Sequence, residues 1–404
     1  MDSKNSHINF SLIDEEFQKN PPKVMKQLRK YCPVHHTEVP APHYTLTRAE
    51  DVLRSLRDER TWSSQYGPGL AFGKVGDGVL VSSDPPEHTR ERLAIANLFK
   101  PSVINRMEKD IRKLTNELVD ELGNRTQGDL IQDYAMPIPL TVMCWLLGTP
   151  IEDIEKFRRW VLPMAEAVSY PGGRDASNET RQAYSEFFAY FGNHIATRSD
   201  QIAEGQEVPN DLLTRLLTVE KDGLRLTNKE VLGFCQFLLV AGSETTTLLI
   251  GNVIYRLLEF PDQMQNLLED NNLLSNAIEE SLRYDAPVHG LFRTNTCPVT
   301  LHDVNIPTGS KVYMMFGAAN RDPQLWEEAD EFKISRNSTD LKKHAAFGVG
   351  THYCLGAPLA RLEATIALET IITRLPSLRL HGSPKEVKAG VLKGFEELPV
   401  CWDL

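Results

Sequence analysis

One stretch of the chain is apolar on almost every helical face and predicts a buried helix. Thr227 and Glu230 have the spacing of a capping box, which marks a helix start. Apolar residues then continue to about Leu258, shortly before Pro261, which makes the helix long for a globular protein. Because it has no polar face, we expect it to pass through the middle of the fold.

A polar segment, Ala-Gly-Ser-Glu-Thr-Thr-Thr at 241–247, interrupts this helix. Burying Glu244 and the hydroxyls of Thr245 and its neighbours is costly unless they have partners. Gly242 and the β-branched threonines also weaken the helix, and threonine hydroxyls can bond to carbonyls one turn back. The alternative to a chemical role is that Glu244 reaches the helix edge and the threonines only satisfy those carbonyls.

A second helix is predicted near the C-terminal end, behind a glycine-rich loop. Pro358 suits its first turn, and apolar residues at 359, 362, 366, 368 and 371 fall on roughly one face. A shorter helix start follows the double proline at 85–86, with His88 and Arg92 one turn apart. Taken alone, that start is typical of an exposed helix end with mixed charges.

Cys354 lies directly before the C-terminal helix, among Gly348, Gly350 and Gly356. Glycines let the backbone pass close to a flat group and turn its amides toward the sulfur. The amides at the helix start favour a thiolate over a thiol, and a thiolate held in this way suits the axial ligand of a haem iron. The alternatives are an inert cysteine, or zinc bound with His352. Zinc needs three or four ligands, and no other Cys or His is close by.

The run 347–361 resembles the haem-binding signature of bacterial cytochrome P450 monooxygenases. Its Phe-Gly-x-Gly-x-His-x-Cys-x-Gly-x-x-Leu-Ala-Arg pattern matches at every fixed position, and the resemblance extends from about residue 50 to the end. It implies a mainly α fold with a small β-rich portion and a long central helix over haem. It also implies haem b, with the Cys354 thiolate as axial ligand to the iron. Further haem-binding residues implied by the resemblance are Ala241, Gly242, Phe347, Gly348 and Gly356.

Three further motifs carry the resemblance. Glu244 and Thr245 look like the family's acid–alcohol pair, which implies proton delivery for O–O bond cleavage. Glu280-x-x-Arg283 looks like its Glu-x-x-Arg motif, with Arg336 as the implied third member of a buried network. In isolation such a pair is usually exposed and worth little. The family's propionate-binding positions are filled by four residues: His88, Arg92, Arg293 and His352.

Composition places limits on the class of protein. The chain has 404 residues, 41% of them hydrophobic and 25% charged, and no linker or repeat, so we expect one domain over 1–404. The net charge of -11 argues against nucleic acid or an anionic membrane as partner. Scattered cysteines, no signal-peptide pattern and no sufficiently long apolar span predict a soluble, cytoplasmic enzyme without a membrane anchor.

Substrate contacts are expected from the family's pocket positions, which here are mostly apolar. The expected pocket residues are Tyr66, Leu70, Phe72, Leu80, Phe237, Val240, Val288, Leu291, Phe292 and Phe395. This lining suits a small or medium hydrophobic substrate. The segment 167–178 is expected to form a mobile roof. His289 and Arg174 are the only polar features that could orient a substrate, although each is better explained as a solvated loop residue.

The resemblance implies a monooxygenase that inserts one oxygen atom from O2, with electrons from a separate ferredoxin and its reductase. Basic residues expected near the cysteine loop would steer a ferredoxin, or only solubilise the surface: Arg90, Lys100, Lys109, Arg112, Lys113, Lys342 and Lys343. The alternatives are oxidative C–C or C–O coupling, a peroxide-driven enzyme, and a non-catalytic haem-thiolate binding protein. The Glu244–Thr245 pair counts against the last two.

Overall fold

The structure, a computed structural model, describes residues 8, 10–70, 79–123, 125–169, 177–221, 224–387 and 391–403. Helices predominate and short strands form the rest, so the expected fold class is confirmed. The helices before the central one are α1 (Glu15–Lys19), α2 (Pro21–Tyr31), α3 (Ala49–Ser55), α4 (Glu87–Ile95), α5 (Pro101–Ile104), α6 (Glu108–Leu122), α7 (Pro137–Leu147), α8 (Ile154–Ser169), α9 (Asn178–Ala203) and α10 (Leu212–Thr218). The others are α11 (Asn228–Glu259), α12 (Pro261–Glu269), α13 (Leu274–Tyr284), α14 (Phe316–Ala319), α15 (Ser338–Leu341) and α16 (Ala357–Arg374).

A five-stranded sheet forms the largest part of the β structure, in the order β1-β2-β10-β7-β3. Its strands are β1 (Val34–Thr37), β2 (His43–Leu46), β3 (Trp62–Ser63), β7 (Leu291–Asn295) and β10 (Lys311–Met314). Only the β2–β10 pairing within it is parallel. Smaller sheets pair β4 (Gln127–Asp129), β11 (Arg379–Leu380) and β14 (Pro399–Cys401), β5 (Glu220–Lys221) with β6 (Leu224–Arg225), β8 (Val299–Leu301) with β9 (Val304–Ile306), and β12 (Lys385–Glu386) with β13 (Phe395–Glu397).

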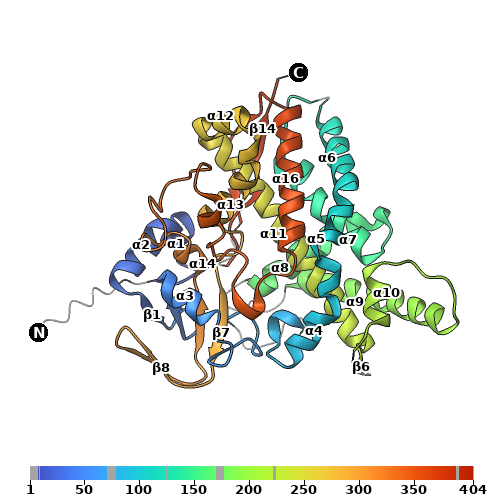
Figure 1. The fold of residues 1–404 in the computed structure, drawn as a ribbon, viewed down its shortest axis with the longest axis horizontal. Coiled ribbons are helices and arrows are strands. Elements are labelled where there is room, and N and C mark those ends of the chain that lie inside the picture. Colours follow the sequence, from blue (N-terminus) through green and yellow to red (C-terminus); the bar gives the residue numbers. More distant parts are fainter. Residues whose placement is uncertain are drawn as a thin grey trace, which may run out of the picture.

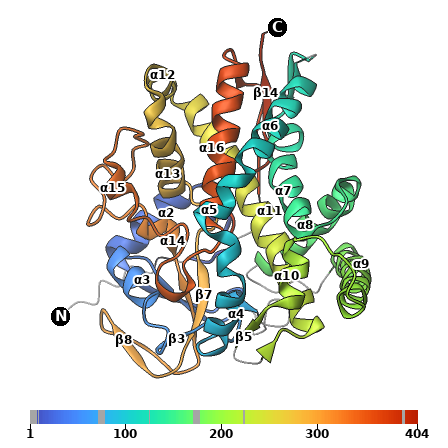
Figure 2. The same cartoon turned by 45° about the vertical axis from the view of Figure 1, so that its right-hand side comes forward.

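A helical part and a β-rich part of the fold lie on opposite sides of α11. Figures 1 and 2 show α6 to α10 on one side and the five-stranded sheet with α1 to α3 on the other. α16 runs beside α11 and α6 and packs against both. The site described below therefore lies where the helical part meets β7 and the loop before α16.

α11 is the buried helix that the apolar pattern predicts. Thr227 Oγ1 accepts from the Glu230 N–H, and Glu230 returns a carboxylate to the Thr227 N–H, which completes the predicted capping box. Within the described ranges, α11 alone is long and apolar enough to cross a membrane, but 72% of its most apolar window is buried inside the protein. Its apolar character is thus accounted for by its position in the core.

A buried ion-pair network joins α13 to the segment before the cysteine loop. Glu280 and Arg283 are fully buried, and the Arg283 Nε and Nη2 each donate to a Glu280 carboxylate oxygen at 2.7 Å. Arg283 Nη1 also donates to the carbonyls of Asn320 and Ala329. Arg336 Nε reaches Glu280 Oε1 at 3.1 Å, so the implied third member is in contact. The network holds three separate segments around one carboxylate.

Candidate active site

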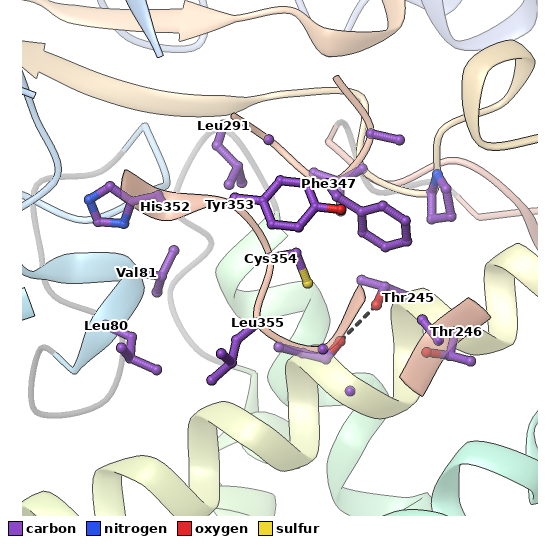
Figure 3. Close-up of a pocket in the computed structure, with 18 of the residues that line it drawn as sticks. Leu80, Val81, Thr245, Thr246, Leu291, Phe347, His352, Tyr353, Cys354 and Leu355 are labelled. Carbon is purple, nitrogen blue, oxygen red and sulfur yellow. Dashed lines mark hydrogen bonds between the residues drawn. The ribbon is translucent and has the colours of Figure 1, made fainter. Parts of the chain in front are cut away.

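A cavity of ≈ 260 Å³ lies between α11, α16, β7 and the cysteine loop. Figure 3 shows the Cys354 sulfur and Thr245 on its wall, with Leu291, Phe347 and His352 around them. The structure therefore brings together residues from motifs more than 250 positions apart. The predicted site residues that line it are Leu80, His88, Arg92, Phe237, Ala241, Gly242, Thr245, Val288, Leu291, Arg293, Phe347, Gly348, His352, Cys354 and Gly356.

The loop around Cys354 depends on glycine at two positions. Gly348 and Gly350 have φ values of 67° and 74°, in the left-handed region that side chains with a Cβ rarely adopt. A Cβ on Gly350 would also lie 3.0 Å from the Leu56 carbonyl oxygen. The Cys354 N–H donates to the Phe347 carbonyl at 2.8 Å and closes the loop. This geometry presents the sulfur to the cavity at the start of α16.

Two backbone amides hold the Cys354 sulfur, as the sequence predicts. The N–H groups of Gly356 and Ala357 donate to Sγ, and Arg92 and Arg361 add positive charge nearby. Burial nevertheless raises the pKa of the Cys354 thiol, and these contacts only oppose that rise. The two amides and the two arginines are the contacts that favour the thiolate form. Iron coordinated by the sulfur would hold it in that form, because metal coordination deprotonates a thiol.

The cavity has a cationic end whose donors are incompletely paired. Arg293 is 4% exposed, and burial lowers the pKa of its guanidinium to about 10. Within the described ranges it has no ion pair; its Nη1 donates only to the Phe292 carbonyl at 3.0 Å. Among the described residues the buried His88 Nδ1 has no hydrogen-bond partner, and the centroid of its ring lies 4.2 Å from that of His352. This end fits an anionic group such as the two propionates of haem.

Protonation of the two histidines is disfavoured at this end. Burial, the Arg293 charge and His88 lower the pKa of His352 to about 2. Burial followed by Arg92 lowers that of His88 as well. Both rings are therefore neutral hydrogen-bonding groups near neutral pH, and His352 Nε2 is 3.2 Å from Ser64 Oγ. The two arginines carry the positive charge of this end.

The polar segment of α11 divides into two environments. The Thr245 hydroxyl lines the cavity and donates to the Ala241 carbonyl at 2.7 Å, the hydrogen bond drawn dashed in Figure 3. Glu244 is buried outside the cavity lining, and burial together with Glu166 and Glu396 raises the pKa of its carboxyl to about 7. A carboxyl with that pKa can gain and lose a proton at neutral pH.

Five predicted pocket residues within the described ranges do not line the cavity. Leu70 and Phe292 belong to the cluster around Phe10 and Tyr313, and Val240 packs against the main core. Phe395 lies 4.5 Å from the ring of Tyr255, and Tyr66 is 44% exposed at the surface. These five do not line the ≈ 260 Å³ cavity, and a role for them in substrate binding stays a prediction. Phe72, Arg174 and most of the predicted roof lie outside the described residues.

Some lining residues were not predicted. Met143 reaches the cavity from α7 because Gly242 has no side chain: a Cβ there would lie 2.9 Å from the Met143 sulfur. Glu363 on α16 is buried, its Oε2 has no partner, and burial raises the pKa of its carboxyl well above the usual range. His289 borders a separate small pocket with Leu392 and does not line the cavity. Helical spacing could have indicated Glu363, two turns after Gly356.

Comparisons with known proteins agree with this geometry. A family model described as Cytochrome P450 matches residues 150–389. The chain is 37% identical over 377 residues to Cytochrome P450 107B1 of Saccharopolyspora erythraea, covering 88% of each chain. It is 34% identical to Cytochrome P450 monooxygenase PikC of Streptomyces venezuelae, over 98% of this chain and 94% of that one.

Solved structures are similar over almost the whole chain. The structure of P450BioI in complex with an acyl carrier protein ligated to hexadec-9Z-enoic acid has a TM-score of 0.88 and 30% identity. It covers 96% of this chain and 100% of that one. CYP109E1 from Bacillus megaterium in complex with testosterone has a TM-score of 0.83 at 30% identity, covering 95% and 100%.

Proposed function

The chain belongs to the bacterial cytochrome P450 family of monooxygenases, and we propose that it hydroxylates a hydrophobic substrate on a haem b bound through the Cys354 thiolate. One observation carries this proposal: the Cys354 sulfur and the Thr245 hydroxyl line the same cavity, whose cationic end has unpaired donors. When bound, the haem supplies O2 activation and the oxidising power for the reaction.

The protein's own residues would hold the sulfur ligand, balance the charge of the propionates and transfer protons. Gly356 and Ala357 amides steady the sulfur, while Arg92 and Arg293 balance the propionates with help from His88 and His352. Thr245 presents a hydroxyl oxygen to the cavity, and Glu244 exchanges protons behind it near neutral pH. Together they would move protons inward without admitting bulk water to the apolar wall.

The substrate we infer is uncharged and largely apolar where it meets the active site. Phe237, Leu80, Val288 and Leu291 provide aliphatic and aromatic surface, and Thr245 adds a hydroxyl beside them. The relatives differ in what they bind, an acyl chain on a carrier protein in one and testosterone in another. We infer a terpenoid, aromatic, polyketide or fatty acyl substrate, and the apolar wall accommodates each of these classes.

We also propose one domain, a cytoplasmic location and electrons from a separate ferredoxin. Four of the seven basic residues expected to steer it are already paired: Arg90 with Glu230, Arg112 with Glu108 and Glu369, Lys113 with Glu117, and Lys343 with Asp340. The exposed Lys100, Lys109 and Lys342 have no ion pair within the described ranges. Steering would therefore rest on these three.

The test is an optical titration of the ferric protein with a panel of hydrophobic compounds. A saturable low-spin to high-spin shift with one scaffold, followed by product carrying 18O from labelled O2, is the expected result. Product without the label would favour oxidative coupling, and binding without turnover would favour a non-catalytic haem protein. Cys354→Ala should lose the ferrous–CO band typical of thiolate ligation, and a retained band would overturn the assignment of the ligand.

A further inference from the structure

A buried carboxylate on α13 binds to two residues that flank the cysteine loop. Glu279 precedes Glu280 of the core network but makes separate contacts. Its Oε2 lies 3.0 Å from His344 Nε2. Arg361, on α16, donates from Nε to Oε1 at 2.5 Å and from Nη2 to Oε2 at 3.0 Å. The cysteine loop therefore lies between a histidine and an arginine that share one anion.

The hydrogen-bond directions define the charges in this cluster. The Ala346 N–H donates to His344 Nδ1 at 3.2 Å, so the ring proton lies on Nε2 and is donated to Glu279. Burial acts to raise the pKa of Glu279, but hydrogen bonds from Arg361 and His344 outweigh it and lower that pKa to about 2. The cluster thus holds an ionised carboxylate, a guanidinium and a neutral imidazole.

Arg361 also contacts both sides of the cysteine. Its guanidinium lies over the ring of Phe347, 4.6 Å from the centroid, and its Nη1 donates to the Tyr353 hydroxyl at 3.1 Å. Figure 3 shows the Phe347 and Tyr353 rings together, beside the Cys354 sulfur. The Arg361 cation therefore lies against the Phe347 ring, close enough for its charge to act on the Cys354 sulfur, and its counter-ion Glu279 is on α13.

We propose that Arg361 is a positioning residue whose charge raises the reduction potential of the haem-thiolate centre, and that Glu279 partly offsets that charge while holding it in place. The inference rests on the proposed function, since it needs a haem at Cys354. Reduction adds one electron from the reductant to the centre, so a nearby positive charge stabilises the reduced state and a negative charge destabilises it. Hydrogen bonds and charges around a ligating sulfur tune potentials in this way.

Two substitutions that shift the midpoint potential in opposite directions would distinguish an effect of charge from an effect of packing. Arg361→Gln removes the cation and should shift the midpoint potential of the purified holoprotein to a more negative value. Glu279→Gln removes the anion and should shift it to a more positive value. A purely structural role would disturb the loop in both variants and has no reason to give opposite signs. Arg361→Lys keeps the charge and should remain close to the parent protein.

A matched control lies on the same helix. Arg374 of α16 donates to Asp120 at 2.5 Å and to Asn116 at 2.9 Å, but away from the cavity. Arg374→Gln should leave the potential and the ferrous–CO spectrum unchanged. This variant removes the same charge from the same element, so it measures the effect of net charge alone.

The measurement is a spectroelectrochemical titration, with the ferrous–CO spectrum recorded for each variant. Shifts of the same sign in Arg361→Gln and Glu279→Gln, or no shift in either, would overturn the inference. If Arg361→Gln gives no folded holoprotein, the positive shift in Glu279→Gln decides the question, and its absence rejects the inference. A parent protein without a thiolate-ligated haem spectrum would instead reject the proposed function, so the two failures are distinguishable.

Discussion

The Thr245 hydroxyl donates to the Ala241 carbonyl one turn back in α11, at 2.7 Å. Its proton is thereby directed along the helix, while its oxygen lone pairs remain available to the cavity that Thr245 lines. Thr247 makes the same contact with Ser243 at 2.9 Å, but on a buried face that does not line the cavity. The two threonines therefore share a local structure and differ in what they face.

Thr245→Ala is expected to uncouple the enzyme. Without the hydroxyl in the cavity, proton delivery loses its final group, so reductant is consumed while product falls by about 10-fold or more and peroxide accumulates. The measurement is the ratio of product to NADH consumed, with peroxide assayed in parallel. Thr247→Ala is the matched control and should remain coupled. Unchanged coupling in Thr245→Ala would refute the role.

Glu244→Gln is expected to change how stability depends on pH. Burial raises the pKa of Glu244 from 4.5 to about 7, so the folded protein binds this proton more tightly than the unfolded chain. This tighter proton binding adds about 3 kcal/mol to the free energy of unfolding. The added stability is fully present below pH 4.5 and is lost as the pH rises through 7. Denaturant unfolding of parent and variant between pH 5 and 8 gives the comparison.

The difference in unfolding free energy between Glu244→Gln and the parent should thus move in favour of the variant as the pH rises. Other buried groups, such as Asp285 and His289, titrate equally in both proteins and cancel in this difference. Glu166→Gln removes one of the charges that raise the Glu244 pKa and should lower the midpoint of the effect. A difference that stays constant from pH 5 to 8 would contradict the buried acid.

Arg283→Ala is expected to yield protein that does not incorporate haem. The substitution leaves the fully buried Glu280 carboxylate without its bidentate partner and frees the Asn320 carbonyl, a loss of about 3–5 kcal/mol. Arg379→Ala, which breaks an exposed pair with Asp403, should leave stability and haem content close to those of the parent. Haem content per protein and thermal unfolding check this. Full haem loading in Arg283→Ala would show that the network is dispensable.

The central helix and the cysteine loop could be predicted because their signals are local. The capping box of Thr227 and Glu230 and the glycines around Cys354 act within a few residues of the structure they determine. The cavity wall could not, because Met143 reaches it through the missing side chain of Gly242, a contact between two helices far apart in sequence. Nor could the sequence show which side of β7 faces the cavity: neighbouring residues on a strand point to opposite faces, and Leu291 lines the cavity whereas Phe292 packs in the cluster around Phe10 and Tyr313.

The surroundings that set the pKa of the Cys354 thiol could not be fully predicted from the local sequence either. The sequence indicates the amides at the start of α16, which do contact the sulfur, but not the charge that Arg92 adds nearby. Arg92 lies in a segment over 250 residues away, so only the fold shows that its charge favours the thiolate. The partners of the basic residues were hidden in the same way, since Arg112 pairs with Glu369 of α16.

Electron transfer from a ferredoxin should depend on the basic residues that the fold leaves unpaired. Lys100 and Lys109 are exposed, whereas Lys343 pairs with Asp340 at 2.6 Å and its field is largely cancelled. We expect Lys100→Glu and Lys109→Glu each to lower the second-order rate of reduction about 3–10-fold at low ionic strength. The measurement is stopped-flow reduction by an acidic ferredoxin over a range of salt concentrations.

The lowered rate of reduction in these two variants should return to the parent value as salt is added. Charges farther apart than the Debye length, about 10 Å at 0.1 M, are then screened. Lys30→Glu is the control, since this exposed lysine lies on α2, which Figure 1 shows on the other side of α11 from α5 and α6. Equal losses in Lys30→Glu and Lys100→Glu would mean that net charge, not a docking surface, sets the rate. A reduction rate independent of salt in the parent protein would rule out steering altogether.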